Sequence, residues 1–177
     1  MANESTFNRV KYGLKMNHIF AQTVAEEIGM ERTVELFKKT GEKMGTTQGG
    51  LLRQQAGIKK FDAHMAATLV RATYESLGIS IKMEEESPRI VLVKCTKCPN
   101  YTAAHELGID DKTIECWCRA GNINFIDTLV NQFNPDLTCR LVKFRRSPED
   151  FCGEEIVEMI NLGLSAFASV NLNNNLE

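Results

Sequence analysis

Cysteines are the residues of this chain best suited to chemistry, and they are concentrated in its second half. Residues 1–94 contain no cysteine, and all six cysteines of the 177-residue chain follow them. A disulfide scaffold would need thiols along the whole chain, so this concentration indicates a local site. A metal ion, an iron–sulfur cluster or a nucleophilic thiol would each account for it. The cysteines are Cys95, Cys98, Cys116, Cys118, Cys139 and Cys152.

Cys95 and Cys98 form a C-x-x-C pair. Such a turn can present two thiolates to one metal ion, and here it lies where a predicted strand runs into a helix. Because Cys98 is close to the N-terminus of that helix, the helix dipole is expected to lower the pKa of its thiol. A second pair of this kind is missing, since Cys116 and Cys118 are separated by one residue. On a helix such positions lie about 200° apart, so only one of the two can face a common site.

The preferred metal ligands are therefore Cys98, Cys118 and Cys152, with Cys95 as a fourth thiolate. Cys152 follows a predicted tight turn, and Cys116 remains the alternative to Cys118. Four thiolates favour structural zinc or an iron–sulfur cluster, whereas three thiolates with an open position favour catalytic zinc.

The elements that must position these thiols follow from the hydrophobic pattern. Apolar residues recur at helical steps in the first half, which predicts helices over about 7–24, 31–44 and 61–77, with a break at 46–50. In the second half, period-two alternation and turn residues predict strands over about 79–83, 90–95, 137–145 and 152–159, with a turn at 84–88. Helices over 101–107 and 111–133 are inserted between the second and third strands.

The predicted fold class is α+β, with N-terminal helices packed on a four-stranded antiparallel sheet. Cys139 shares a strand face with Leu141, so it is assigned to the core. A single domain is expected over 1–172, with a helical part at 1–78 and a cysteine-rich α+β part at 79–160. Residues 173–177 are expected to form a disordered tail, and its Leu176-Glu177 end is typical of a cloning scar.

Composition narrows the class of partner. The chain has 21 Lys and Arg against 23 Asp and Glu, a net charge of −2, so nucleic acid is not an expected partner. The basic residues at 140–146 are interpreted as a solvated strand face. Neither a signal peptide nor a membrane span is predicted. The chain is expected to be cytoplasmic, where thiols stay reduced, and to take a small-molecule ligand, with a homodimer as the candidate assembly.

Four motifs of the cysteine-rich half together resemble one known family. They are K-C-P-N-Y-T-A-A-H-E-L-G at 97–108, E-C-W-C at 115–118, F-N-P at 133–135 and E-D-F-C at 149–152. Their order resembles that of L-2-amino-thiazoline-4-carboxylic acid hydrolase-like proteins, whose layout is similar to the 4-vinyl reductase domain. Two features depart from the family pattern. Asn122 stands near the position where an acid usually follows the middle cysteine, and Cys95 is an additional thiol.

The resemblance implies a hydrolase that opens a C–N or C–S bond of a cyclic amidine. It places the metal ligands at Cys98, at Cys118 or Cys116, and at Cys152. Thiolate-bound zinc could polarise the ring, activate water or hold the departing sulfur. Alternatively, Cys98 attacks the substrate directly with His105, two helical turns further on, as the base.

The implied substrate also carries a carboxylate, for which Arg119 and Arg140 are the candidate partners. Trp117 could form the wall of a pocket for a flat ring. Two further functions stay open. One is a non-enzymatic small-molecule binder or sensor of the 4-vinyl reductase type, and the other is an iron–sulfur protein that uses the three preferred cysteines and Cys95.

Overall fold

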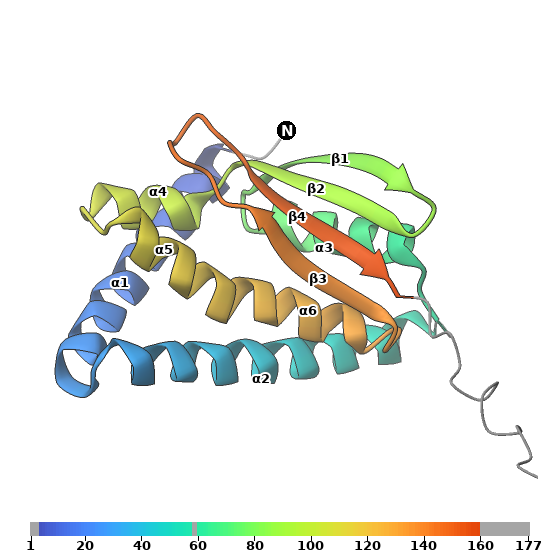
Figure 1. Cartoon of the computed structure of the whole chain (residues 1–177), viewed down its shortest axis with the longest axis horizontal. Coiled ribbons are helices and arrows are strands. Elements are labelled where there is room, and N and C mark those ends of the chain that lie inside the picture. Colours follow the sequence, from blue (N-terminus) through green and yellow to red (C-terminus); the bar gives the residue numbers. More distant parts are fainter. Residues whose placement is uncertain (1–3, 58–59, 160–177) are drawn as a thin grey trace, which may run out of the picture.

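Long helices precede a four-stranded antiparallel sheet in the computed structural model, which describes residues 4–57 and 60–159 (Figure 1). This arrangement confirms the predicted α+β class. The helices are α1 Glu4–Ile28, α2 Met30–Ala56, α3 Ala63–Ser76, α4 Pro99–Glu106, α5 Asp111–Trp117, η1 Cys118–Ile123 and α6 Asn124–Asn131, and the strands are β1 Ser80–Ser87, β2 Ile90–Lys97, β3 Leu137–Lys143 and β4 Cys152–Glu158.

The sheet has the order β1-β2-β4-β3, so the last strand of the chain lies between the second and the third. Alternate residues of the central strand β2 are buried, because one face of the sheet is covered by helices, and the same face of β4 is buried together with Gly153. The buried face carries Val91, Val93 and Cys95 from β2, and Cys152, Glu154 and Ile156 from β4.

Helices cover that face in two layers. Helix α3 packs on β1, β2 and β4, and α6 packs on β3. Helix α2 lies behind α6 and η1, and runs along them in Figure 1, while α1 packs against α4. The core between the sheet and the first layer is where the cysteine-rich half of the chain meets α3.

Local sequence signals set the ends of α3. Asp62 caps its N-terminus by accepting a hydrogen bond from the Met65 backbone N–H at 2.8 Å. Gly78 follows its C-terminus with φ of 76°, in the left-handed region that favours glycine. A Cβ at this position would also lie 2.8 Å from the Phe7 backbone, so glycine allows α1 to approach.

The predicted break at 46–50 is wrong, because α2 runs through these residues without interruption. Gly41, Gly45 and Gly49 lie four residues apart and therefore on one face of the helix, which we call the glycine seam. A Cβ at Gly41 would lie 2.5 Å from the Gly121 carbonyl oxygen, and one at Gly45 would lie 2.6 Å from that of Phe125. A glycine within a helix costs about 1 kcal/mol, but here it lets two helical backbones approach closely.

The region predicted as one helix over 111–133 is helical but irregular. It consists of α5, the π-helical segment η1 and α6. A π-helical turn holds more residues than an α-helical turn, so it changes which side chains face the sheet. The turn predicted at 84–88 is also displaced, since β1 extends to Ser87 and the chain turns at 88–89.

The end of the expected domain at 172 and the predicted tail at 173–177 lie outside the described residues. Within the described residues, no helix combines the length and apolar character needed to cross a membrane.

Replacing Gly45 with alanine tests the glycine seam. The new Cβ would lie 2.6 Å from both the Phe125 carbonyl oxygen and Thr128 Cβ, so α2 and α6 must move apart. We expect Gly45→Ala to lower the free energy of unfolding, measured by urea denaturation, by about 2 kcal/mol. Gly50→Ala is the matched control in the same helix, because its Cβ would meet no atom within 4 Å. The control should gain about 0.5 to 1 kcal/mol from helix propensity, and equal effects of the two variants would contradict the seam.

Candidate functional site

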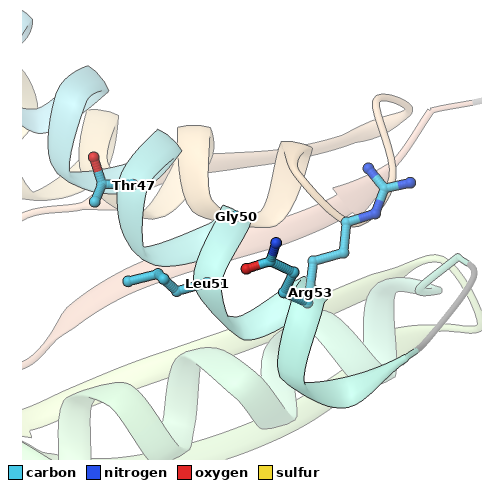
Figure 2. A pocket seen from close by; sticks show the side chains of 5 residues that line it. Thr47, Gly50, Leu51 and Arg53 are labelled. Atoms are coloured by element: carbon cyan, nitrogen blue, oxygen red, sulfur yellow. The ribbon is translucent and has the colours of Figure 1, made fainter.

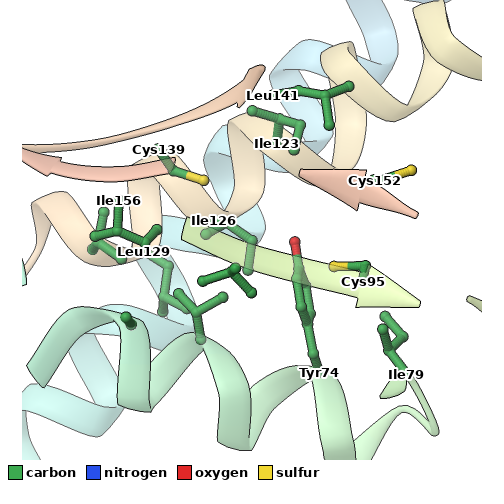
Figure 3. Close-up of a cluster of buried hydrophobic side chains, with 14 of the residues drawn as sticks. Tyr74, Ile79, Cys95, Ile123, Ile126, Leu129, Cys139, Leu141, Cys152 and Ile156 are labelled. Carbon is green, nitrogen blue, oxygen red and sulfur yellow. The ribbon is translucent and has the colours of Figure 1, made fainter. Parts of the chain in front are cut away.

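Cys95 and Cys152 lie opposite each other on the two central strands. They are register partners of β2 and β4, and both are buried. Figure 3 shows both residues on the sheet, with Tyr74 rising toward them from α3. The sheet therefore brings together the first and the last cysteine of the chain.

Glu154 is a carboxyl group buried in the same layer, only 4% exposed. It accepts a hydrogen bond from the Tyr74 hydroxyl at 2.8 Å, and its other oxygen lies 3.6 Å from Cys95 Sγ, which donates. Burial raises the pKa of Glu154 to about 7, although these two hydrogen bonds act in the opposite direction. Glu154 was not identified from the sequence. The sequence did contain a signal for it, because Cys152 and Glu154 lie two residues apart on a predicted strand and therefore share a face.

Arg145 is a buried cation beside the thiols. Its assignment to a solvated strand face is wrong, because the residue is only 1% exposed. Its Nε lies 3.4 Å from Cys152 Sγ, and its Nη2 donates to the Cys95 carbonyl oxygen at 2.5 Å. The guanidinium also lies 5.0 Å from the centre of the Tyr101 ring.

Cys98 and Cys118 reach the same region from the helical layer. Cys98 immediately precedes α4, and Cys118 begins η1. Burial is the main cause of the raised pKa of Cys118, and negative charge at Glu154, Cys98 or Cys152 would raise it further. The pKa of Cys95 is raised by burial and by the same kind of neighbours, Cys118 among them. Four thiols thus share one region, in which Cys95 and Cys152 are buried and Cys98 and Cys118 are partly exposed. We call Cys95, Cys98, Cys118 and Cys152 the thiol cluster.

The prediction that a helix dipole lowers the pKa of Cys98 is wrong. Burial raises this pKa, and the backbone amides of Tyr101 and Asn100, together with Arg145, offset the rise only in part. The loss of water around a thiolate outweighs the dipole of a helix of eight residues. The neutral thiol is therefore the resting form of Cys98.

The C-x-C pair divides between two environments. Both thiols are half-buried, but only Cys118 is among the neighbours that raise the pKa of Cys95, and Cys98 and Cys152 raise the pKa of Cys118 in turn. Cys139 is buried in the core, as predicted, and its backbone N–H donates to Asp127 Oδ1 at 2.8 Å.

The other predicted site residues lie outside the thiol cluster. His105 is exposed in the last turn of α4, where its ring stacks on Tyr101 with centroids 5.7 Å apart. Trp117 is buried and packs against the rings of His18 and Phe37.

The two candidate arginines are held by carboxylates. Arg119 donates to Glu115 at 2.7 Å and to the Leu141 carbonyl oxygen at 3.0 Å. Arg140 forms an ion pair with Glu155 at 2.6 Å on the exposed side of the sheet. Among the described residues, no hydrogen bond or ion pair joins either arginine to the thiol cluster.

Two cavities of the described residues bear on the search for a site. The larger, of about 610 Å³, is an open hollow on the outer side of α2, lined by Thr47, Gly50, Leu51, Arg53 and Gln54 (Figure 2). The other, of about 400 Å³, lies between α1 and α5. Neither is lined by a cysteine of the thiol cluster.

The thiol cluster has the donor chemistry of a thiophilic metal site. Thiolates with a neighbouring carboxylate suit zinc or iron. In the part of the chain that the structure describes, no three His, Cys, Asp or Glu side chains are arranged so that they could hold a metal ion as they stand. The sulfurs of Cys95 and Cys152 are turned toward Glu154 and Arg145 instead. The donor types fit a metal, and side-chain rotation would have to complete the coordination shell.

Comparison with known proteins adds no relative. A scan against protein-family models and a search of curated proteins found no match to this chain. The resemblance to the thiazoline hydrolase-like proteins therefore rests on the motifs in the cysteine-rich half.

Alkylation of the native protein should separate the thiols. Burial raises the pKa values of Cys95, Cys98, Cys118 and Cys139, and each unit of increase lowers the thiolate fraction about tenfold at pH 8. We expect iodoacetamide to modify Cys116 at least about ten times faster than these four, as measured by peptide mass spectrometry.

Two variants control this experiment. Cys116→Ser should remove the fast phase of alkylation, and Cys139→Ser should leave it unchanged. Rapid modification of Cys98 in the unaltered protein would contradict the buried cluster.

Proposed function

We propose that this chain binds a thiophilic metal ion, zinc in the first instance, at the thiol cluster and acts there as a small-molecule hydrolase. The observation that carries the proposal is the gathering of four thiols near one another, with Cys95 Sγ hydrogen-bonded to a buried carboxyl group, Glu154. Cysteines that serve only as small core residues have no reason to gather around an acid, because burying a carboxyl group costs free energy. A shared cation supplies such a reason.

The charges of the cluster support this proposal. The proposed ligands are Cys98, Cys118 and Cys152, which would leave the fourth position of a zinc ion open for water or substrate. Three thiolates would exceed the charge of a zinc ion by one negative charge, which is costly in a buried site. The guanidinium of Arg145, already beside Cys152, offsets that charge.

The acid–base role in the proposed hydrolysis belongs to Glu154. Its carboxyl group is buried beside the thiols, and the Tyr74 hydroxyl fixes its orientation for proton transfer. His105 takes no part, because it is exposed and contacts Tyr101 instead. When bound, zinc would supply a Lewis acid that polarises the substrate or activates water. The cyclic amidine substrate is taken from the family resemblance.

Access to the site requires movement. Cys95 and Cys152 are buried, and Arg145 contacts both residues from the connection between β3 and β4. The proposal therefore includes an opening of residues 144–151, which would carry Arg145 away from the Cys95 carbonyl oxygen when a substrate enters.

An iron–sulfur cluster is the second candidate. It is favoured by Cys95, the thiol that the family pattern lacks, because four cysteine ligands are the usual set for such a cluster. Cys95 is close to Glu154 and is the register partner of Cys152, so it belongs to the same region as the other three thiols.

The proposed setting is a cytoplasmic protein, since all six cysteines are free thiols and the cytoplasm keeps thiols reduced. A homodimer is proposed as its assembly. Three apolar side chains on one face of α1 support it, because Tyr12, Met16 and Phe20 are 79%, 71% and 69% exposed.

Metal analysis tests the ligand set. We expect about one zinc ion per chain in protein purified with zinc, measured by elemental mass spectrometry after desalting. Cys118→Ser should weaken zinc binding more than about tenfold in a chelator competition, because even outer-shell changes cost that much. Cys116→Ser is the matched control two residues away and should keep its zinc. Equal losses in both variants would contradict the proposal, and iron with acid-labile sulfide in anaerobically purified protein would favour the second candidate.

Hydrolysis of 2-amino-thiazoline-4-carboxylate tests the activity. Ring opening at the C–S bond releases a thiol, which can be followed with a thiol reagent. Glu154→Gln should keep zinc but lower kcat about 100-fold, because it removes the group that transfers the proton. Glu155→Gln is the control, since this neighbour pairs with Arg140 on the exposed side. If all variants hold zinc and none opens the ring, the hydrolase is overturned in favour of a small-molecule binder.

A further inference from the structure

A second candidate site lies on the other side of α5 from the thiol cluster. It is the cavity of about 400 Å³ between the C-terminal half of α1 and α5, a volume within the range of small-ligand sites. None of the cysteines contributes to its walls. Its lining residues are Gln22, Ala25, Glu26, Met30, Gly108, Ile109, Asp110, Thr113 and Trp117.

The inner wall of this cavity is apolar and firmly packed. Trp117 is 4% exposed, and its ring is fixed between His18, at 5.9 Å, and Phe37, at 5.6 Å between centroids. Its indole N–H points to Met30 Sδ at 3.4 Å. The Met30 side chain is 42% exposed and flexible, so it can adapt to the body of a ligand.

The polar part of the cavity is acidic. Glu26 from α1 and Asp110 from the loop before α5 contribute carboxylates, and the lining residues that the structure describes include no lysine or arginine. Asp110 also caps α5 by accepting from the Thr113 backbone N–H at 3.0 Å and from its hydroxyl at 2.7 Å. Those bonds lower the pKa of Asp110 and hold its carboxylate in place.

We propose that this cavity binds a small organic cation with an apolar body, of the amidinium or guanidinium class. The planar head of such a cation matches the two oxygens of a carboxylate, and Glu26 is the one free to turn toward it because it does not cap a helix. The apolar body contacts Ala25, Ile109 and the edge of Trp117. An anion is disfavoured, because the lining offers two carboxylates and no basic side chain.

Trp117 is the only tryptophan of the chain and lines this cavity, so its fluorescence can report on binding there. Titration of the full chain with benzamidinium should produce a saturable change of that fluorescence at millimolar or lower concentration. Benzamide has nearly the same shape without the charge and should bind at least about fivefold more weakly, a loss in the range of one charged hydrogen bond. Equal binding of benzamide, or the absence of a saturable change, would overturn the proposal.

Two neighbouring glutamates provide the variant and its control. Glu26→Gln should weaken benzamidinium binding at least about fivefold, because it removes the pairing charge while keeping the shape. Glu27→Gln, the next residue of α1, does not line the cavity and should bind as the unaltered chain does. Both variants should show the same melting temperature by circular dichroism. Equal weakening by both would show a general charge effect and overturn the proposal.

Discussion

The close approach of α2 to η1 and α6 is the constraint on which the rest of the structure depends. Only a residue without a Cβ can occupy Gly41 and Gly45, since a Cβ there would lie within 2.6 Å of the Gly121 and Phe125 carbonyl oxygens. This contact holds the π-helical segment against the outer helix and so fixes the side of α5 and η1 that faces the sheet. Trp117 consequently turns toward α1, whereas Cys118 turns toward the thiol cluster.

Burial governs the chemistry of the thiol cluster. It raises the pKa values of Cys95, Cys98 and Cys118 and of the Glu154 carboxyl group, so these groups favour their neutral forms. Arg145 is the exception, a buried cation among potential anions. A bound cation would favour the ionised forms of several of these groups at once. The protonation of such a site therefore depends strongly on any added positive charge. That coupling is what links the thiol cluster to the proposed metal chemistry.

Much of the architecture could be predicted, and the errors have local causes. The alternation of apolar and polar residues in the strands, and capping residues such as Asp62, are local sequence patterns. The strands and helices could therefore be predicted. The glycines of α2 were interpreted as a break because glycine is a poor helix former when nothing packs against it. No short sequence pattern marks the π-helical segment. Because this segment decides which of Cys116 and Cys118 faces the sheet, the sequence left the choice between them open.

The sequence by itself determined that the thiols belong to one half of the chain, that one of the C-x-C pair must face away, and that Cys139 lies in the core. Only the tertiary structure decided that Glu154 and Arg145 accompany the thiols and that His105, Arg119 and Arg140 do not. The physical reason is that a local pattern records which face of an element a side chain occupies, but not what lies opposite it. The Tyr74 hydroxyl that holds Glu154 is 80 residues away along the chain, and only packing of α3 on the sheet brings the two together.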